Sequence, residues 1–361
     1  MSSARDRDTA PLLDVVRQRI AEQGPVPVHD YVRLCLEHPL HGYWQRAHTL
    51  GRSGDFITAP EISQVFGELI GIWLIVAWQA LGQPAPLRLV ELGPGRGTLM
   101  RDALRATRIA RGFLEAATLH LVEISESLRL KQQHALSDLQ MPKAWHDGLH
   151  QVPDGAAIVI GNEFLDALPV RQLISCNGAW HERMIAVGPN GVLQFQTGPH
   201  ADDLQIENAS TSGTVLELRP GEDALLDLLG KRSTPFLSLF IDYGPAAPAY
   251  GDTLQAVRGH AYADPLSEPG TADLTAHVQF GHLAGKAKAR GLAAHGPITQ
   301  TEFLGSLGIV ERAGRLMTAN PGCAGEIEAA VQRLISPSGM GSLFKVLLIS
   351  SPGLPPPVPF G

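Results

Sequence analysis

Three glycines at alternate positions follow a short apolar run, and an acidic residue stands inside that run. The run is Leu87–Leu92, the acid is Glu91, and the glycines are Gly93, Gly95 and Gly97. Glycines in a strand-to-helix turn let the backbone approach a ligand closely. A dinucleotide site prefers the spacing G-x-G-x-x-G, and an acid two residues before the first glycine would repel a pyrophosphate. The spacing G-x-G-x-G beside Glu91 therefore favours a cationic cofactor such as S-adenosylmethionine.

Two more acidic residues follow later apolar segments and extend the predicted cofactor site. Glu123 ends the segment Thr118–Glu123, where a carboxylate can accept hydrogen bonds from both ribose hydroxyls of a nucleoside. This feature alone would suit NAD equally well. Asp147 follows a short strand expected near Ala144 and could face the adenine amino group. Each acid could instead be an ordinary polar residue at the end of a strand.

A polar turn after the apolar run Ala156–Gly161 supplies the candidate catalytic residues Asn162, Glu163 and Asp166. Two carboxylates three residues apart can share one face of a helical turn, and such a pair can hold a cationic acceptor. In the alternative interpretation, Asp166 caps a short helix and Glu163 pairs with a distant arginine.

Two further segments could wall a substrate pocket. Asp242 closes the apolar segment Phe236–Ile241, and a loop rich in glycine and proline runs from His260 to His277. Asp273 in this loop could equally be a helix N-cap, because Asp-x-Thr stands before an apolar periodic run.

These candidates follow segments in which strand and helix patterns alternate. Strands are expected at 87–92, 118–123, 144–145, 156–161, 236–241 and 343–350, and helices at 98–111, 126–136, 274–290 and 324–335. Such alternation predicts an α/β fold with a doubly wound, mostly parallel sheet. Ligands of such sheets bind outside the carboxyl ends of the strands, which is where the candidate residues fall.

The N-terminal region is predicted to be helical. Helical spacing covers Pro11–Gln23 and Val28–Glu37, with a glycine-proline breaker between them. Further along, Thr58-Ala-Pro-Glu61 has the pattern of a capping box before an amphipathic helix.

This amphipathic helix is expected to serve as a lid. Gly67 and Gly71 lie one turn apart on it, which indicates close approach of another backbone. Together with the preceding loop Gly54–Phe56, the helix would lie over the cofactor. Thr58 therefore joins the cofactor-binding candidates.

The sequence divides into four expected regions. Residues 1–85 form an N-terminal helical region and lid, and 86–169 with 213–351 form the α/β core. Residues 170–212 interrupt the core with β-like stretches and turn residues such as Asn177-Gly178, which predicts a β-rich insertion. The tail at 352–361 has five prolines and is not expected to fold alone.

The composition is that of a globular protein. Of 361 residues, 44% are hydrophobic and 18% are charged, so the chain can bury a sizeable core. The net charge of -7 gives no global attraction for polyanions. The densest basic cluster, Lys286, Lys288 and Arg290, is expected to be a solvated helix face, so no nucleic-acid partner is predicted.

The cysteines and the N-terminus indicate the compartment. The three cysteines are far apart, and no H-x-x-x-H or H-E-x-x-H pair appears with supporting carboxylates, so neither a disulfide framework nor a metal is expected. Residues 1–10 lack the apolar region of a secretory signal, and the longest apolar stretch, Leu69–Leu81, is too short to span a bilayer. We therefore expect a cytoplasmic protein without membrane insertion.

Four stretches in this order closely resemble the MidA-like family of S-adenosylmethionine-dependent methyltransferases. They are Gly54–Gln64 with Phe66–Glu68, Glu91–Thr98, Asn162–Pro169 and Asp273–Thr275, and the resemblance runs roughly from His41 to Val346. One departure from the family pattern is Gln279, where an acid is usual.

The resemblance implies a class I methyltransferase fold of Rossmann-like type. The mitochondrial members of this family are protein arginine methyltransferases that assist assembly of respiratory complex I. The implied partner is thus a protein substrate, a complex I subunit or its bacterial counterpart, and the implied compartment in a eukaryote is the mitochondrial matrix. Three alternatives remain: a non-catalytic assembly factor, an NAD-dependent oxidoreductase, and a methyltransferase acting on RNA or a small molecule.

Overall fold

The computed structural model of this chain describes residues 10–46, 55, 57–202, 211–247 and 249–361. Two predictions depend on residues outside these ranges: the absence of a secretory signal, on residues 1–9, and the lid loop, on Gly54 and Phe56. The chain forms two compact units. The first comprises Met1–Phe56, Ala167–Glu222 and Ala249–His277, and the second comprises Ile57–Asp166, Asp223–Pro248 and Val278–Gly361.

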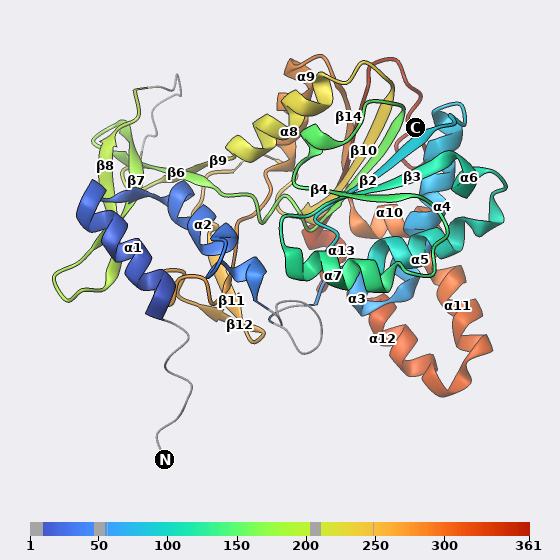
Figure 1. Cartoon of the computed structure of the whole chain (residues 1–361), viewed down its shortest axis with the longest axis horizontal. Helices are drawn as coiled ribbons and strands as arrows, with labels where there is room; N and C mark the ends of the chain where they lie inside the picture. The colour runs from blue at the N-terminus through green and yellow to red at the C-terminus, as the bar shows by residue number, and fades with distance from the viewer. Residues whose placement is uncertain (1–9, 47–54, 56, 203–210, 248) are drawn as a thin grey trace. The chain divides into compact units, whose positions relative to one another are not determined.

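A seven-stranded sheet forms the centre of the second unit, in the order β14-β15-β10-β5-β2-β3-β4 (Figure 1). Neighbours from β10 to β4 are parallel, and β15 runs antiparallel to both β10 and β14. The strands are β2 (Leu87–Leu92), β3 (Ala117–Val122), β4 (Lys143–His146), β5 (Ala157–Asn162), β10 (Phe236–Tyr243), β14 (Ala293–Thr299) and β15 (Phe344–Ser350). The predicted α/β class with a doubly wound, mostly parallel sheet is confirmed.

All six predicted core strands form, and β14 is the one that the sequence pattern missed. Its Gly296-Pro297 pair reads as a break, since proline offers no N–H to a strand ladder. The structure accommodates the pair with a register shift between His295 and Ile298. A proline at such an irregularity is compatible with a strand that pairs on one side only.

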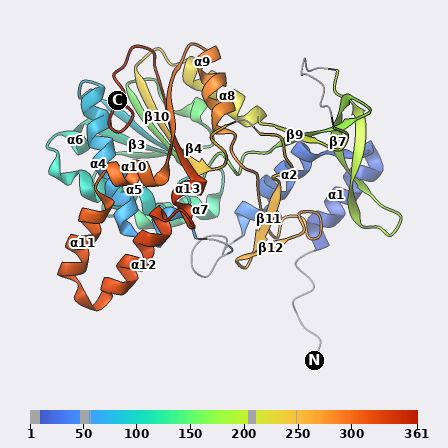
Figure 2. The ribbon, with the colours of Figure 1, turned by 180° about the vertical axis from the view of Figure 1, so that it is seen from behind.

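Helices cover both faces of this sheet. On one face α4 (Gln64–Ala80) packs against α5 (Thr98–Ala106), and Figures 1 and 2 show α8 (Pro220–Gly230) and α9 (Phe280–Ala289) on the other side. A Cβ on Gly67 would lie 2.7 Å from the Asp102 Cβ, and one on Gly71 would lie 2.3 Å from the Ala103 carbonyl oxygen. The predicted close approach of a second backbone to these glycines is therefore confirmed.

The helix predicted to begin at Thr58 is two helices. α3 covers Ala59–Ile62 and ends at Ser63, whose extended backbone separates it from α4. Thr58 makes no side-chain capping bond, and the Glu61 carboxylate instead accepts a hydrogen bond from the Thr98 hydroxyl. The capping-box prediction is wrong, because a tertiary contact takes the acid that the box requires.

The helix predicted at 274–290 begins later. Asp273–Thr275 form β13, which pairs with β11, and α9 begins only at Phe280. Asp273 is therefore a buried strand residue and not a helix N-cap. Strand pairing overrides the local capping pattern here.

The remaining helices of this unit are shorter or lie outside the central layers. The helix predicted at 126–136 is confirmed as α7, and that at 324–335 as α12, whereas the helix predicted at 98–111 ends at Ala106 and continues as a 3-10 turn. The remaining helices and 3-10 turns of this unit are η2 (Thr107–Ile109), α6 (Phe113–Ala116), α7 (Glu126–Ala135), η3 (Leu149–Gln151), α10 (Gln300–Ser306), α11 (Ile309–Ala319), η4 (Pro321–Cys323), α12 (Ala324–Ile335) and α13 (Met340–Leu343).

The first unit is built on antiparallel strands. One sheet has the order β1-β7-β6-β9 with β8 also pairing β7, and a smaller one has the order β12-β11-β13. The elements are α1 (Ala10–Gln23), β1 (Val26–Pro27), α2 (Val28–Glu37), η1 (Tyr43–Gln45), β6 (Arg171–Cys176), β7 (Ala179–Val187), β8 (Leu193–His200), β9 (Val215–Leu218), β11 (Gln255–Arg258) and β12 (Ala261–Ala263). Both predicted N-terminal helices are confirmed. Asn177 and Gly178 have positive φ, as the two-residue hairpin turn between β6 and β7 requires.

The boundaries of the two compact units differ from those of the regions expected from the sequence. Residues 57–85 fall in the unit that holds the core sheet, because α4 packs on α5, and residues 249–277 fall in the other unit. Strands β1 and β9, from outside 170–212, join the sheet formed by that segment. Within the described part of the chain, no helix combines the length and apolar composition needed to cross a membrane.

Candidate active site

The candidate residues converge because the carboxyl ends of the parallel strands lie at one edge of the sheet. In the register of β2 with its two neighbours, Leu92 lies beside Val122 of β3 and Gly161 of β5. Asn162 lies beside Ile241 of β10. The glycine turn after β2 and the acidic turn after β5 therefore start from adjacent positions.

The glycine turn has the left-handed backbone that its sequence demands. Gly93, Gly95 and Gly97 have φ values of 62°, 54° and 81°, which residues with a Cβ rarely adopt. Gly97 then serves as the N-cap of α5. A Cβ on Gly93 would lie 3.0 Å from the Phe164 Cδ2, so the glycine turn contacts the acidic turn directly.

Two carboxylates of this region are buried close together. Glu91 is 3% exposed, and its Oε2 atom has no hydrogen-bond partner among the residues that the structure describes. Burial, and then the charge of Glu123, raises the pKa of Glu91 to about 8. Burial also raises the pKa of Glu123, against the opposing effect of hydrogen bonds from Ser125 and Gln132. An unpaired buried carboxylate is costly, and a cationic or donor group bound beside it would offset that cost.

Gln132 on α7 is a residue of this region that the sequence analysis missed. Its Nε2 donates to the Gly95 carbonyl oxygen at 2.8 Å and to Glu123 Oε2 at 3.1 Å. The Trp145 indole N–H donates to Gln132 Oε1 at 2.9 Å. A glutamine inside a helical segment carries no sequence signal for such a bridge, because its partners come from two other loops.

Asp147 differs from the other predicted cofactor residues in being exposed. Its side chain is 68% exposed and forms an ion pair of 2.6 Å with Arg129. This pairing, together with a bond from Gln151, lowers the pKa of Asp147. Asp147 does follow β4, at the same edge of the sheet as Glu123.

The acidic turn after β5 holds Asn162, Glu163 and Asp166. Glu163 has a φ of 49°, a strained conformation for a residue other than glycine. Its Oε1 accepts the Asn162 Nδ2 at 3.1 Å and the Ala59 backbone N–H at 2.8 Å. The Oδ1 atom of Asn162 is buried and has no hydrogen-bond partner within the described part of the chain. Burial, and then the charge of Asp166, raises the pKa of Glu163 to about 7.

The short helix α3 contacts both turns. Ala59 at its start binds Glu163, while the Glu61 carboxylate accepts the Thr98 hydroxyl at 2.5 Å and lies 3.6 Å from the Arg96 guanidinium. Thr58 directly precedes this helix and is partly buried. One four-residue segment thus joins the glycine turn to the acidic turn.

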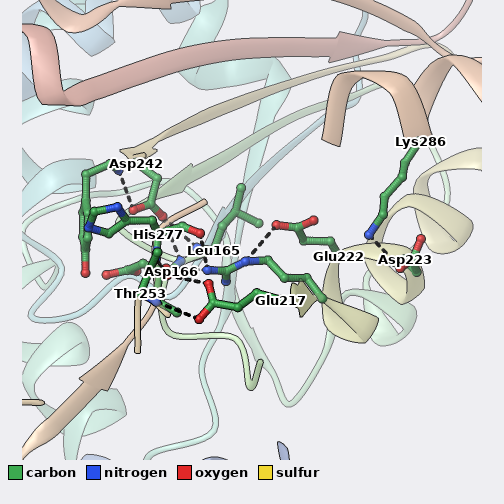
Figure 3. Close-up of polar contacts among 12 residues, drawn as sticks. Leu165, Asp166, Glu217, Glu222, Asp223, Asp242, Thr253, His277 and Lys286 are labelled. Carbon is green, nitrogen blue, oxygen red and sulfur yellow. Dashed lines mark hydrogen bonds and ion pairs between the residues drawn. The ribbon is translucent and has the colours of Figure 1, made fainter. Parts of the chain in front are cut away.

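Two of the three residues of the basic cluster, Lys286 and Arg290, are paired with acids of α8. Lys286 donates to Asp223 at 2.9 Å (Figure 3), and Arg290 binds both Asp223 and Asp227. Among the residues that the structure describes, no three histidine, cysteine, aspartate or glutamate side chains gather as a metal site would need.

The family is decided by comparison with known proteins. Residues 69–298 match the model of a family described as putative S-adenosyl-L-methionine-dependent methyltransferases. This chain belongs to that family. It is therefore an S-adenosylmethionine-dependent methyltransferase, and the predicted fold type, cofactor and enzyme class are confirmed.

Proteins similar to this methyltransferase include curated animal relatives. It is 36% identical to the protein arginine methyltransferase NDUFAF7 homolog, mitochondrial, of Drosophila melanogaster, over 96% of this chain and 86% of that protein. It is 33% identical to the human protein arginine methyltransferase NDUFAF7, mitochondrial, over 94% of this chain and 83% of that protein.

A solved structure of a likely methyltransferase from Burkholderia thailandensis, of the COG1565 superfamily, has the same architecture. Its TM-score with this methyltransferase is 0.85 at 28% identity, covering 97% of this chain and 94% of that one. The Burkholderia protein is bound to S-adenosyl-homocysteine. These likenesses confirm the resemblance that the four sequence stretches indicated.

Proposed function

We propose that this methyltransferase transfers a methyl group to an arginine nitrogen of a protein, a respiratory complex I subunit or its bacterial counterpart. The observation that carries the proposal is the pair of carboxylates, Glu163 and Asp166, on a strained turn in contact with the glycine turn. Carboxylates are the groups that bind a guanidinium most strongly. The names of the animal relatives, which are protein arginine methyltransferases, support the same acceptor.

The cofactor half of the site fits S-adenosylmethionine. Glu91 offers a cationic ligand a buried oxygen that no described residue binds, and Glu123 can accept ribose hydroxyls. Gly93, Gly95 and Gly97 leave room along the backbone, while Thr58 and Asp147 stand at the lid and at the end of β4. When bound, the cofactor supplies an activated methyl group on a sulfonium.

The acceptor half prepares the arginine nitrogen for attack. A free guanidinium keeps its proton, because its pKa lies above about 12. Glu163 and Asp166 orient it and draw positive charge away from the attacking nitrogen, and Asn162 offers a further acceptor oxygen. Since the pKa of Glu163 is raised to about 7, this carboxylate is a better proton acceptor than an ordinary glutamate. Positioning accounts for much of the rate.

The proposed compartments follow from the same kinship. The animal relatives are named as mitochondrial proteins. In a eukaryote this methyltransferase would act in the mitochondrial matrix, and in a bacterium it would act in the cytoplasm.

Glu163→Gln tests the proposal. The probe is the full chain with radiolabelled S-adenosylmethionine and the purified complex I subunits of the host, followed by mass spectrometry for methylarginine. We expect methyl transfer to fall by roughly 100- to 1000-fold, because the variant loses its proton acceptor. The affinity for S-adenosylhomocysteine should stay within about threefold, since Glu163 lies outside the cofactor half.

Glu311→Gln is the matched control, because it neutralises an exposed carboxylate on α11. It should transfer methyl groups at the wild-type rate. Full activity of Glu163→Gln would exclude the proposed role. Absence of label from every arginine in the presence of wild-type protein would exclude the proposed acceptor.

A further inference from the structure

Asp242 is a fully buried carboxylate near the end of β10, and its oxygens bind backbone groups of the acidic turn. Its side chain is 0% exposed. Oδ2 accepts the N–H of Leu165 at 2.9 Å and the N–H of Asp166 at 3.1 Å, and Oδ1 accepts the N–H of Tyr243 at 2.8 Å (Figure 3). One side chain therefore ties the turn after β5 to the neighbouring strand.

These bonds meet a need that the strand ladder cannot satisfy. The parallel pairing of β5 with β10 ends where Asn162 lies beside Ile241. The N–H groups of Leu165 and Asp166 come after this point, and both donate to Asp242 Oδ2. Asp242 therefore supplies an acceptor for them beyond the end of the ladder.

Burying a carboxyl group to bind these N–H groups is energetically unfavourable. Burial raises the pKa of Asp242 well above its usual range, and the charges of Asp166 and Glu163 raise it further. The fold thus gathers three acids at one place, where the charges of Asp166 and Glu163 disfavour the ionised form of Asp242. A buried acid at this position is understandable if the turn must be held in one geometry and must bind a cation.

The strained backbone of the turn points the same way. Glu163 keeps its φ of 49° only because the surrounding contacts over-determine it. The Glu163 side chain is fixed from one side by Ala59, and the turn that follows it is fixed from the other side by Asp242. Loss of the second anchor would let the backbone relax and move the Glu163 carboxylate.

We infer that Asp242 is a positioning residue of the acceptor site. It holds the 163–166 turn so that the carboxylates of Glu163 and Asp166 converge on one cationic acceptor. This inference rests on the proposed function, in which those two carboxylates bind the acceptor arginine. Asp242 itself need not touch the acceptor, because its oxygens bind backbone groups.

Two variants of Asp242 separate its contributions. Asp242→Ala removes all three bonds. Asp242→Asn keeps one acceptor oxygen for Leu165 and Asp166 but turns an NH2 group toward the Tyr243 N–H. Ser238→Ala is the matched control, because Ser238 is an equally buried polar residue on the same face of β10, four residues away.

Three measurements are made on the full chain. Amide hydrogen exchange of the 162–169 segment reports the turn, calorimetry with S-adenosylhomocysteine reports folded sites and the cofactor half, and methyl transfer to the host complex I subunits reports kcat and KM. For Asp242→Ala we expect faster exchange in the segment and an S-adenosylhomocysteine affinity within about threefold of wild type. We also expect kcat/KM, counted per protein molecule that binds S-adenosylhomocysteine, to fall by roughly 100-fold, because a misplacement of about one ångström can have such an effect.

The conservative variant and the control sharpen the result. Asp242→Asn should recover part of both the exchange protection and kcat/KM, and Ser238→Ala should match wild type in both. A merely structural role would lower the number of cofactor sites and leave kcat per site unchanged, which would overturn the inference. Unchanged exchange in Asp242→Ala would also overturn it.

The inference and the proposed function fail in different ways. If Glu163→Gln is fully active while Asp242→Ala loosens the turn, the proposed acceptor site is wrong and Asp242 is only an anchor of the turn. If Glu163→Gln is inactive while the loosened Asp242→Ala protein keeps full activity per site, the proposed function stands and the positioning role is wrong.

Discussion

The two turns of the proposed active site are built in opposite ways. The glycine turn at 93–97 takes its conformation from its own residues, since three glycines adopt positive φ without a steric cost. The acidic turn at 162–166 contains Glu163 at positive φ, and contacts from Ala59 and Asp242 hold it. The cofactor half is therefore encoded locally, and the acceptor half is encoded by the tertiary structure.

The electrostatics of the two halves are nevertheless alike. In each half burial raises the pKa of one glutamate, to about 8 for Glu91 and to about 7 for Glu163. In each half a second acid adds to the effect, Glu123 in the first and Asp166 in the second. In both halves the ionised form of the glutamate is disfavoured until a cationic ligand binds beside it, which suits a sulfonium on one side and a guanidinium on the other.

Glu91→Gln should give the largest effect on the cofactor half. It removes the buried carboxyl group that can ionise beside the cationic ligand, so we expect S-adenosylhomocysteine and S-adenosylmethionine to bind roughly 100-fold more weakly, a loss of about 2.7 kcal/mol. Calorimetry with both ligands checks this. The loss should be greater for the cationic S-adenosylmethionine, and an equal or smaller loss would contradict the electrostatic reason.

The same variant should stabilise the protein without ligand at alkaline pH. In the fold Glu91 holds its proton up to a pKa of about 8, whereas a free glutamate loses it near 4.5. Between these values the folded protein binds one more proton than the unfolded chain, so the free energy of unfolding falls as pH rises. Glutamine has no such proton. We expect Glu91→Gln to gain on the order of 5 kcal/mol at pH 9 relative to pH 4, measured by urea unfolding at both values.

The contrast between the halves also explains what the sequence could predict. The alternating strands and helices, the glycine turn and the acids at strand ends are all local patterns, and the structure places them as expected. The capping box at Thr58 failed because Thr98, nearly forty residues away, binds the Glu61 carboxylate. Likewise Asp273 pairs in a strand although its neighbours favour a helix start. Local rules fail where a long-range partner takes the group that the local rule needs.

Residues that bridge two loops were the hardest to foresee. Gln132 joins Gly95 to Glu123, and Asp242 joins β10 to the turn after β5. Asp242 was expected at the pocket wall because it ends a strand, yet nothing in its neighbours reveals that its oxygens bind backbone N–H groups. Such roles depend on which turn folds beside which strand, and no pattern in one segment contains that information.

Asp166→Asn tests whether a second acid raises the pKa of the glutamate in the acceptor half, as Glu123 does for Glu91 in the cofactor half. Methyl transfer requires ionised Glu163, so kcat/KM should rise with pH through about 7 in the wild type. Removing the neighbouring charge lowers the pKa of Glu163, so the acid limb should move to lower pH. The plateau should also fall by about 10-fold, because one of two acceptor carboxylates is lost. The measurement is kcat/KM for the complex I subunits from pH 5.5 to 9.

Asp154→Asn is the control for this profile, because Asp154 precedes β5 at the opposite end of that strand. Its acid limb should coincide with that of the wild type. If the acid limb of Asp166→Asn lies at the same pH as that of the wild type, the charge of Asp166 does not raise the pKa of Glu163. The two halves would then differ in this respect, because only the cofactor half would have a second acid that raises the pKa of its glutamate.

Asp147→Asn should have the smallest effect and defines the edge of the cofactor half. The Asp147 side chain is 68% exposed and already paired with Arg129, so we expect S-adenosylhomocysteine affinity to fall by no more than about threefold. Gln132→Ala is the comparison within the same half. It removes the buried bonds to Gly95 and Glu123, so a loss of about 10-fold is expected, near 1.4 kcal/mol. Calorimetry on both variants ranks them. If Asp147→Asn lowers the S-adenosylhomocysteine affinity more than Gln132→Ala does, the cofactor contacts the end of β4 more strongly than the burial of these side chains indicates. The cofactor half would then extend beyond the glycine turn and Glu123.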